Sequence, residues 1–242
     1  MKPYAAFASD PVILVSDTHY RPGSRSIRTI IALAASRGVE TLIVLGDLFD
    51  DLHRLLSASE VGKALRCIFK GARGLRVIFV TSLSSHDPIL RESVHFKSDE
   101  LDLHVYPGPV IAQLGGLTAF LTHGDLALRN GAQAFLINFL MKSLGKELFL
   151  EKALRQKLRL PADWWLFMGH THIPGIDYEA RVANTGSWRE SWVLGIPYWR
   201  PPSNTYLFVE SGRVELCQEL FKAKRRGHET WLKRSVRKTS RR

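Results

Sequence analysis

The chain lacks the features that would mark a secreted, disulfide-rich or membrane-spanning protein. Only two of its 242 residues are cysteines, Cys67 and Cys217, and a disulfide framework needs more, so we expect buried thiols in a reducing compartment. No apolar stretch reaches the length of a membrane span, and residues 1–4 do not resemble the start of a signal peptide. These absences favour a cytoplasmic protein.

Internal repeats and linker-like tracts of proline, glycine and serine are also absent, which argues against a repeat protein or a chain of several domains. A length of 242 residues is enough for one α/β domain with a sizeable core. We expect that domain over residues 1–221, followed by a C-terminal tail over residues 222–242.

Positive charge is concentrated in this tail. Residues 222–242 hold ten basic residues and one acid, Glu229, so they carry +9 of the formal net charge of +11. A tail of this kind binds nucleic acid or an anionic membrane surface without specificity, or is simply a solvated end of the chain. All three readings stay open.

Apolar runs alternate with helical patterns in the first third of the chain. Runs at residues 12–16, 41–45 and 75–81 have the character of buried strands, and helical patterns at 26–36 and 52–69 separate them. This order implies parallel pairing of the strands.

Later runs complete the predicted fold. Residues 103–106 and 110–112 are expected in a second sheet, and Ser211-Gly212 separates the strands of a hairpin near the end. The whole pattern predicts an α/β fold, a two-sheet β-sandwich flanked by helices.

Five apolar runs each end in a cluster of acidic or imidazole side chains. Side chains at strand ends are held by a rigid sheet and are open to solvent at one edge, which is where α/β folds place their sites. A single cluster is equally well explained by an Asp- and Gly-rich turn, but five of them favour a metal site, because carboxylates and neutral imidazoles are metal ligands. The clusters are Asp17-Thr18-His19, Gly46-Asp47-Leu48-Phe49-Asp50, Ser84-Ser85-His86-Asp87, Thr122-His123-Gly124-Asp125 and Gly169-His170-Thr171-His172.

The ordered set Asp-x-His, Gly-Asp-x-x-Asp, His-Asp, His-Gly-Asp and Gly-His-x-His resembles the calcineurin-like metallophosphoesterases over about residues 12–190. The resemblance implies a four-layer α/β/β/α sandwich and two divalent metal ions, with Mn expected and Zn or Fe as alternatives. It assigns Asp17, His19, Asp47 and His172 to the first ion, with Asp47 bridging, His123, His170 and Ser85 to the second ion, and His86 to the scissile phosphate, with Asp50 orienting its imidazole.

The third cluster departs from the family pattern. The family usually has Gly-Asn-His there, and the Asn amide oxygen binds the second ion, whereas this chain has Ser84-Ser85-His86. A serine hydroxyl is a shorter and poorer neutral ligand, so we expect the second ion to bind more weakly.

The resemblance predicts a metal-dependent phosphoesterase that hydrolyses phosphomonoesters or phosphodiesters of a small molecule or nucleotide with a metal-activated water. Arg189 is a candidate for binding the phosphate, because a guanidinium matches it bidentately. One alternative is a nuclease or nucleic-acid-binding phosphodiesterase that uses the basic tail. Another is a non-catalytic binding scaffold, similar to the retromer subunit of this family, if the second metal site has decayed at Ser85. The oligomeric state is not indicated.

A long helical stretch at about residues 131–160 is inserted between His123 and His170. It is either a helix pair packed on the sheet or a cap that receives an apolar part of the substrate. The insertion and the flanking Gly-Asp-Leu-Phe and Gly-His-Thr-His-Ile-Pro resemble the UDP-diacylglucosamine hydrolases, which makes a UDP-lipid pyrophosphate hydrolase a further alternative. Those enzymes usually carry Asn-Arg where this chain has Ser85-His86.

Four histidines have no matching neighbours in the sequence and are expected to be ordinary surface or core residues. They are His53, His95, His104 and His228.

Overall fold

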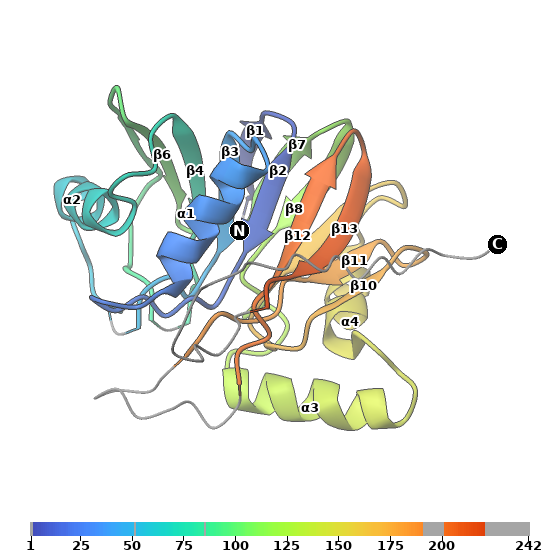
Figure 1. Cartoon of the computed structure of the whole chain (residues 1–242). Coiled ribbons are helices and arrows are strands. Elements are labelled where there is room, and N and C mark those ends of the chain that lie inside the picture. The colour runs from blue at the N-terminus through green and yellow to red at the C-terminus, as the bar shows by residue number, and fades with distance from the viewer. Residues whose placement is uncertain (1, 51, 85, 191–200, 221–242) are drawn as a thin grey trace, which may run out of the picture.

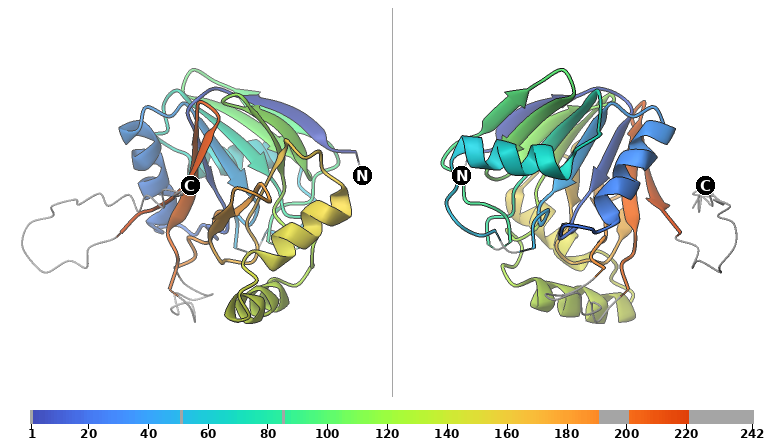
Figure 2. Two further views of the ribbon diagram at one scale, coloured as in Figure 1. Left: turned by 90° about the vertical axis from the view of Figure 1, so that its right-hand side faces the viewer. Right: turned by 60° about the vertical axis from the view of Figure 1, so that its left-hand side comes forward.

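Two β-sheets packed face to face form the centre of the computed structural model, which describes residues 2–50, 52–84, 86–190 and 201–220 (Figures 1 and 2). The seven-stranded sheet has the order β13-β12-β2-β3-β4-β6-β5, and the six-stranded sheet has the order β1-β7-β8-β9-β11-β10. The strands are β1 (Tyr4–Ala8), β2 (Val12–Val15), β3 (Thr41–Leu45), β4 (Leu75–Val80), β5 (Val94–Lys97), β6 (Leu101–Tyr106), β7 (Val110–Leu114), β8 (Leu117–Leu121), β9 (Trp165–Met168), β10 (Gly175–Asp177), β11 (Val182–Asn184), β12 (Thr205–Glu210) and β13 (Arg213–Gln218).

Helices cover the outer face of each sheet, so the predicted four-layer α/β/β/α sandwich is confirmed. Helices α1 (Ser26–Ser36) and α2 (Ala58–Ile68) pack on the seven-stranded sheet, where Ile30 and Leu65 join one apolar cluster with strand residues such as Val44. Helix α4 (Phe149–Leu158) packs on the six-stranded sheet through Leu154. A third apolar cluster fills the space between the sheets.

The middle of the seven-stranded sheet is parallel. Strands β2, β3, β4 and β6 pair in parallel register, and the residues of β2, β3 and β4 are almost all buried, because both faces of the sheet are covered there. Parallel strands present their carboxyl ends at one edge, and loops that follow β2, β3 and β4 therefore meet there.

Two predictions about this sheet are corrected. The helix expected from residue 52 begins at Ala58, because Ser57 and Glu60 form a capping box that fixes its start, and Leu55 lies exposed ahead of it. The strand at residues 103–106 belongs to the seven-stranded sheet and pairs with β4. Of the two predicted strands, only β7 lies in the six-stranded sheet.

Other predicted elements are confirmed. Helix α1 spans residues 26–36, and β12 and β13 form an antiparallel hairpin in which Ser211 and Gly212 have the positive φ angles of a tight turn. The insertion is a helix pair, α3 (Gly131–Ser143) and α4, and Figure 1 shows α3 lying below the sandwich.

Ser85 and the basic tail at residues 222–242 lie outside the described residues. No helix of the described part combines the length and apolar character needed to cross a membrane.

Candidate metal centre

Five loops at the carboxyl ends of strands bring the predicted site residues together. Asp17 and His19 follow β2, Asp47 follows β3, His86 follows β4, His123 follows β8, and the Gly-His-Thr-His segment follows β9. The backbone of these loops is strained: six non-glycine residues have φ between 42° and 67°, a region that L-residues seldom adopt and that is typical of functional sites. They are Asp17, His19, Asp47, His86, His170 and His172.

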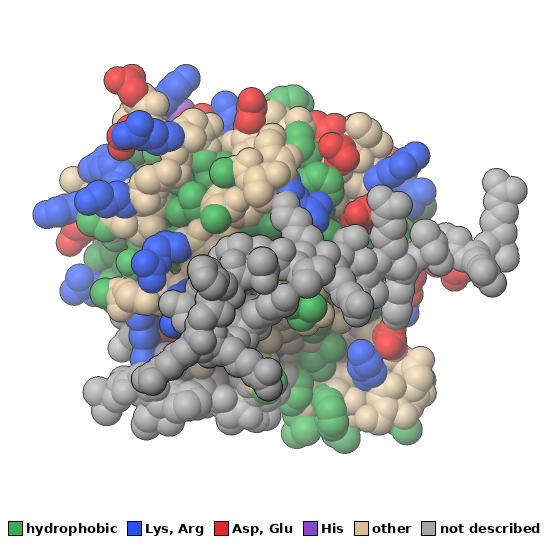
Figure 3. Space-filling model, viewed as in Figure 1, with side chains coloured by type: hydrophobic (Ala, Val, Ile, Leu, Met, Phe, Trp, Pro, Cys, Tyr) green, Lys and Arg blue, Asp and Glu red, His purple; other side chains and the backbone are tan. Residues whose placement is uncertain are grey.

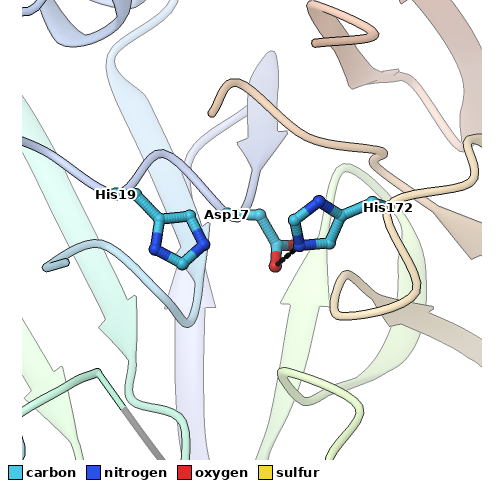
Figure 4. A group of neighbouring side chains, drawn as sticks. All are labelled: Asp17, His19 and His172. Atoms are coloured by element: carbon cyan, nitrogen blue, oxygen red, sulfur yellow. Dashed lines mark ion pairs between the residues drawn. The ribbon is translucent and has the colours of Figure 1, made fainter. Parts of the chain in front are cut away.

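Two of the groups of potential ligand atoms at this point share Asp17, and the atoms of each group lie within 4.8 Å of one another. One group is Asp17, His19 and His172, and the other is Asp17, Asp47 and His123. Figure 4 shows the rings of His19 and His172 on either side of Asp17, and the dashed line marks the 3.0 Å between Nε2 of His172 and Oδ1 of Asp17.

Asp47 belongs to the second group and also lies close to His19 of the first. Its Oδ2 atom is 3.7 Å from Nε2 of His19, and its Oδ1 atom is 3.5 Å from Nε2 of His123. These distances are too long for hydrogen bonds. They are close to the spacing of about 3.4 Å between two ligands that share one tetrahedral ion. A carboxylate with one oxygen toward each group is the arrangement that bridging requires.

His170 completes the second group. Its Nδ1 atom lies 2.9 Å from Nε2 of His123, while its Nε2 atom lies 2.7 Å from the carbonyl of Leu128. Because a carbonyl only accepts, the proton of His170 is on Nε2, and Nδ1 is left with its lone pair toward the centre.

Several buried ligand atoms have no hydrogen-bond partner among the described residues, and this is the test of whether the cluster fits metal ions. The atoms are both ring nitrogens of His19 and Oδ1 of Asp47. Unpartnered polar atoms of this kind are costly in a protein interior, and a bound cation would satisfy them. The residues therefore fit a metal centre.

Electrostatics support this fit. Burial raises the pKa of Asp47 to about 7, against the opposing effect of His123. Burial also opposes a charge on His123, but Asp47 and Asp17 outweigh it and raise the pKa of His123 to about 9. Burial and the nearby His123 lower the pKa of His170 to about 4, and burial with the charge of Arg189 holds the pKa of His19 well below its ordinary value. His170 and His19 are thus neutral at pH 7, the form in which imidazole binds metals.

Asp87 holds the loop that carries Asp47, a role that the sequence did not reveal. Its carboxylate accepts hydrogen bonds from the backbone N–H groups of Asp47 (2.7 Å), Leu48 (3.0 Å), Phe49 (3.3 Å) and Ser82 (2.8 Å). The one sign of this role in the sequence was that an acidic residue directly follows His86. Its burial and the Asp47 carboxylate raise its pKa to about 7.

Close packing fixes the loop with Asp17. The Oδ2 atom of Asp17 accepts hydrogen bonds from Ser16 Oγ and from the N–H of His170. Gly169 leaves room for these contacts, since a Cβ atom there would lie 2.1 Å from Ser16 Oγ and 2.4 Å from Asp17 Oδ2.

The predicted link between Asp50 and His86 is present, but its chemistry differs from the expectation. Nδ1–H of His86 donates to the backbone carbonyl of Asp50 at 2.6 Å. The carboxylate of Asp50 pairs instead with Arg21 and with Nη2 of Arg189, the latter at 3.1 Å. Two cations have drawn the carboxylate away, so a carbonyl, not a carboxylate, orients the imidazole.

His86 and Arg189 lie beside the centre. The ring of His86 lies 4.8 Å from that of His19. Burial and the charge of Arg189 lower the pKa of His86. The structure therefore brings together every predicted site residue within its described part.

A buried network joins the helical insertion to the Gly-His-Thr-His loop, and sequence inspection missed it. Glu151 of α4 is fully buried, and its carboxylate accepts hydrogen bonds from Asn138 of α3, from Asn184 at the end of β11 and from Thr171. Burial raises the pKa of Glu151. Thr171 stands between His170 and His172, so the insertion supports the loop that carries both imidazoles.

Comparison with known proteins agrees with this arrangement. The family model of the calcineurin-like phosphoesterase superfamily domain matches residues 11–210. Comparison with curated protein sequences gave no match.

Solved structures with a similar fold include the phosphoesterase Yfce from E. coli (20% identity, 86% of this chain and 92% of that chain covered, TM-score 0.46). Others are a single mutant of Vps29 from Entamoeba histolytica (15% identity, 85% and 96% covered, TM-score 0.45) and a predicted phosphoesterase from Streptococcus pneumoniae (17% identity, 86% and 88% covered, TM-score 0.42).

Proposed function

The chain belongs to the calcineurin-like phosphoesterase superfamily, and on that premise we propose that it hydrolyses phosphomonoesters or phosphodiesters with two divalent metal ions. The observation that carries the proposal is the set of buried ligand atoms without a hydrogen-bond partner on His19 and Asp47. When bound, two such ions lower the pKa of a water molecule toward neutrality and stabilise the oxygens on both sides of an in-line displacement at phosphorus.

The ligands divide into two sets. Asp17, His19, Asp47 and His172 would bind the first ion, and Asp47, His123 and His170 the second, with Ser85 as a weak further ligand. Mn²⁺ is our first expectation, because the set mixes carboxylates with imidazoles; Zn²⁺ and Fe²⁺ suit it as well.

Arg189 and His86 would act on the substrate. The guanidinium of Arg189 is held by Asp50 and offers charge-assisted hydrogen bonds to a phosphate. His86 carries its proton on Nδ1 and directs Nε2 away from the Asp50 carbonyl. A bound phosphate dianion favours the imidazolium form, which would then stabilise developing charge or give a proton to the leaving oxygen.

The direct test is hydrolysis of aryl phosphate mono- and diesters by the full chain, assayed with Mn²⁺, Zn²⁺ and Fe²⁺ and after removal of metal by a chelator. We expect turnover that depends on the added ion and is lost in Asp47→Asn. Absence of turnover with every ion, in protein shown by circular dichroism to be folded, would refute the proposal.

A second candidate is a phosphoesterase or UDP-lipid pyrophosphate hydrolase whose substrate carries an apolar group. Helix α3 begins beside His170, and large apolar side chains lie exposed along it, at the lower edge of the molecule in Figure 3. They are Leu136, Phe139, Leu140 and Leu144. An exposed apolar face next to a site is typical of a surface that receives an apolar ligand.

Substrate length tests this second candidate. Phosphate esters with long alkyl groups should have a lower KM than short ones, and Leu140→Glu should remove that preference, whereas Lys142→Glu on the same helix should not. Equal KM values for long and short esters would dismiss it.

The scaffold alternative rests on Ser85, and the six other ligands oppose it. Metal analysis separates the two: about two equivalents of Mn²⁺ support the enzyme, and none supports the scaffold. Ser85→Asn should tighten binding of the second ion and raise activity.

The nuclease alternative rests on residues 222–242. It requires that their deletion abolish salt-sensitive nucleic-acid binding while small-substrate hydrolysis continues.

A further inference from the structure

A second cluster of imidazole and carboxylate groups lies at the edge of the seven-stranded sheet. His95 of β5 and His104 of β6 are direct cross-strand partners, and Asp102 precedes His104 by two residues, so all three side chains project from one face. Asp102 pairs with Arg76 near the start of β4, which places the cluster toward the opposite end of the strands from the candidate metal centre. These histidines are therefore not the isolated residues that the sequence suggested.

Three potential ligand atoms converge in this cluster. Nε2 of His95 lies 2.9 Å and Nε2 of His104 3.0 Å from the same oxygen, Oδ1 of Asp102. The two rings stack with their centroids 4.0 Å apart and 23° between their planes. Within the described chain, Nε2 of His104 is a buried nitrogen without a hydrogen bond of acceptable alignment, although it points at Asp102.

Only Oδ1 of the carboxylate faces the two imidazoles, and it accepts a hydrogen bond from His95 at 2.9 Å that an ion would replace. Nε of Arg76 donates a 2.9 Å hydrogen bond to Oδ2 of Asp102 and so fixes the carboxylate from its other side. Burial favours the neutral acid, but hydrogen bonds from His95 and Arg76 outweigh it and hold the pKa of Asp102 well below its ordinary value. Asp102 is thus ionised at neutral pH, as a ligand must be.

His104 is also in the form that a metal needs. Burial lowers the pKa of His104, against the opposing effect of Asp102, so its imidazole is neutral at pH 7. The side chain of His95 is 54% exposed, and that of His104 25%, which gives an ion a path from solvent.

We propose that His95, Asp102 and His104 form a separate binding site for a late first-row divalent cation of the Zn²⁺ type. Two imidazoles and one carboxylate are a common ligand set for such ions, with open positions left for water. Ligand atoms of a tetrahedral ion lie about 3.4 Å apart, so small rotations of the two rings would admit one. Because β5 is an edge strand that pairs only with β6, the ion would cross-link the edge of the sheet and stabilise it.

Zn²⁺ binding to the metal-free full chain tests the proposal, by equilibrium dialysis at pH 7.5 followed by metal analysis. His95→Ala should bind one equivalent less than the wild type and lose part of the rise in Tm that Zn²⁺ produces. Lys97→Ala is the matched control, since Lys97 lies on the same strand and face without being a ligand, and it should bind as the wild type does. An unchanged stoichiometry and affinity in His95→Ala would overturn the proposal.

A second variant separates this site from the phosphoesterase centre. In Asp47→Asn, where the candidate metal centre is impaired, one Zn²⁺ should still bind, and addition of His95→Ala should remove it. Loss of that ion without the His95 change would also overturn the proposal. Phosphoester hydrolysis should be unaffected in His95→Ala, so failure of the hydrolase proposal and failure of this one give different results.

Discussion

The hydroxyl of Thr171 donates a 3.1 Å hydrogen bond to Oε1 of Glu151, and this contact ties the helical insertion to the loop of the candidate metal centre. The same oxygen accepts a 2.8 Å hydrogen bond from Asn184, whose side chain also donates to the carbonyl of Gly169. A carboxylate on α4 thus sets the position of both histidines that flank Thr171. Partners of this kind, one layer behind the ligands, orient metal ligands and are sensitive to mutation.

Glu151→Ala should weaken Mn²⁺ binding by about 10-fold, because the loop loses its support. It should also lower the free energy of unfolding by about 3 kcal/mol, since buried donors of Asn138, Asn184 and Thr171 are left without an acceptor. Glu151→Gln keeps an acceptor oxygen, so it should reach most of the wild-type activity when the Mn²⁺ concentration is high. Hydrolysis rates of both variants, measured across a Mn²⁺ titration, check these expectations.

The control for Glu151 is Lys152→Ala on the same helix. Lys152 pairs with Asp177 at the surface, and its loss should change neither metal affinity nor rate. A Glu151→Ala protein with the Mn²⁺ dependence of the wild type would show that the network serves stability alone.

Arg189→Met should reduce kcat/KM for a phosphate ester by about 10- to 100-fold, the value of one to two charge-assisted hydrogen bonds. Arg189→Lys keeps the charge but not the planar fork, so its loss should be smaller and should fall mainly on KM. Steady-state kinetics with a phosphomonoester distinguish the two. Arg28→Met on the exposed face of α1 is the matched control and should leave kcat and KM unchanged. A wild-type KM in Arg189→Met would show that Arg189 does not bind the substrate.

Gly169→Ala and Gly131→Ala form a matched pair beside the candidate metal centre. A Cβ atom at Gly169 would meet Ser16 Oγ at 2.1 Å and Asp17 Oδ2 at 2.4 Å, so the loop must shift and Asp17 with it. A Cβ atom at Gly131 would have only an ordinary contact, 3.5 Å from Cε1 of His170. We expect Gly169→Ala to lose most Mn²⁺ binding and activity, and Gly131→Ala to retain both. Equal behaviour of the two variants would contradict the close packing at Gly169.

The metal ligands could be predicted from the sequence for a physical reason. The residues that hold those ligands in place could not. Asp17, Asp47 and His123 each follow an apolar run directly, so local pattern alone places them at strand ends. Glu151 lies in the first turn of an amphipathic helix, and its role depends on how α4 packs on the loop after β9. No local signal carries that information.

Long-range competition explains the errors at Asp50 and at residues 103–106. The carboxylate of Asp50 pairs with Arg189, which is distant in sequence. Only the folded chain shows that Arg189 competes with His86 for this carboxylate. The strand at 103–106 has the alternating pattern of either sheet; its parallel register with β4 decides which.

The stability of the metal-free protein should fall as the pH rises from 6.5 to 8.5. His123 keeps its proton to about pH 9 in the folded state but loses it near 6.5 when unfolded, so its contribution is complete below pH 6.5 and is lost through pH 9. The raised pKa of Asp47, about 7, acts in the same direction in the lower part of this window, because the folded state holds a proton that the unfolded chain has released. One proton corresponds to at most about 1.4 kcal/mol per pH unit.

Saturating Mn²⁺ should reverse this trend, because the ion binds only deprotonated ligands and its stabilisation therefore grows with pH. Urea unfolding at pH 6.5, 7.5 and 8.5 measures how the free energy of unfolding changes with pH, once with chelator and once with Mn²⁺. Asp47→Asn removes the main partner of His123 and should flatten the slope in chelator. If instead the chelator-treated wild type becomes more stable toward pH 8.5, then His123 is not held protonated by the two aspartates, and the charge arrangement inferred for the metal-free protein is incorrect.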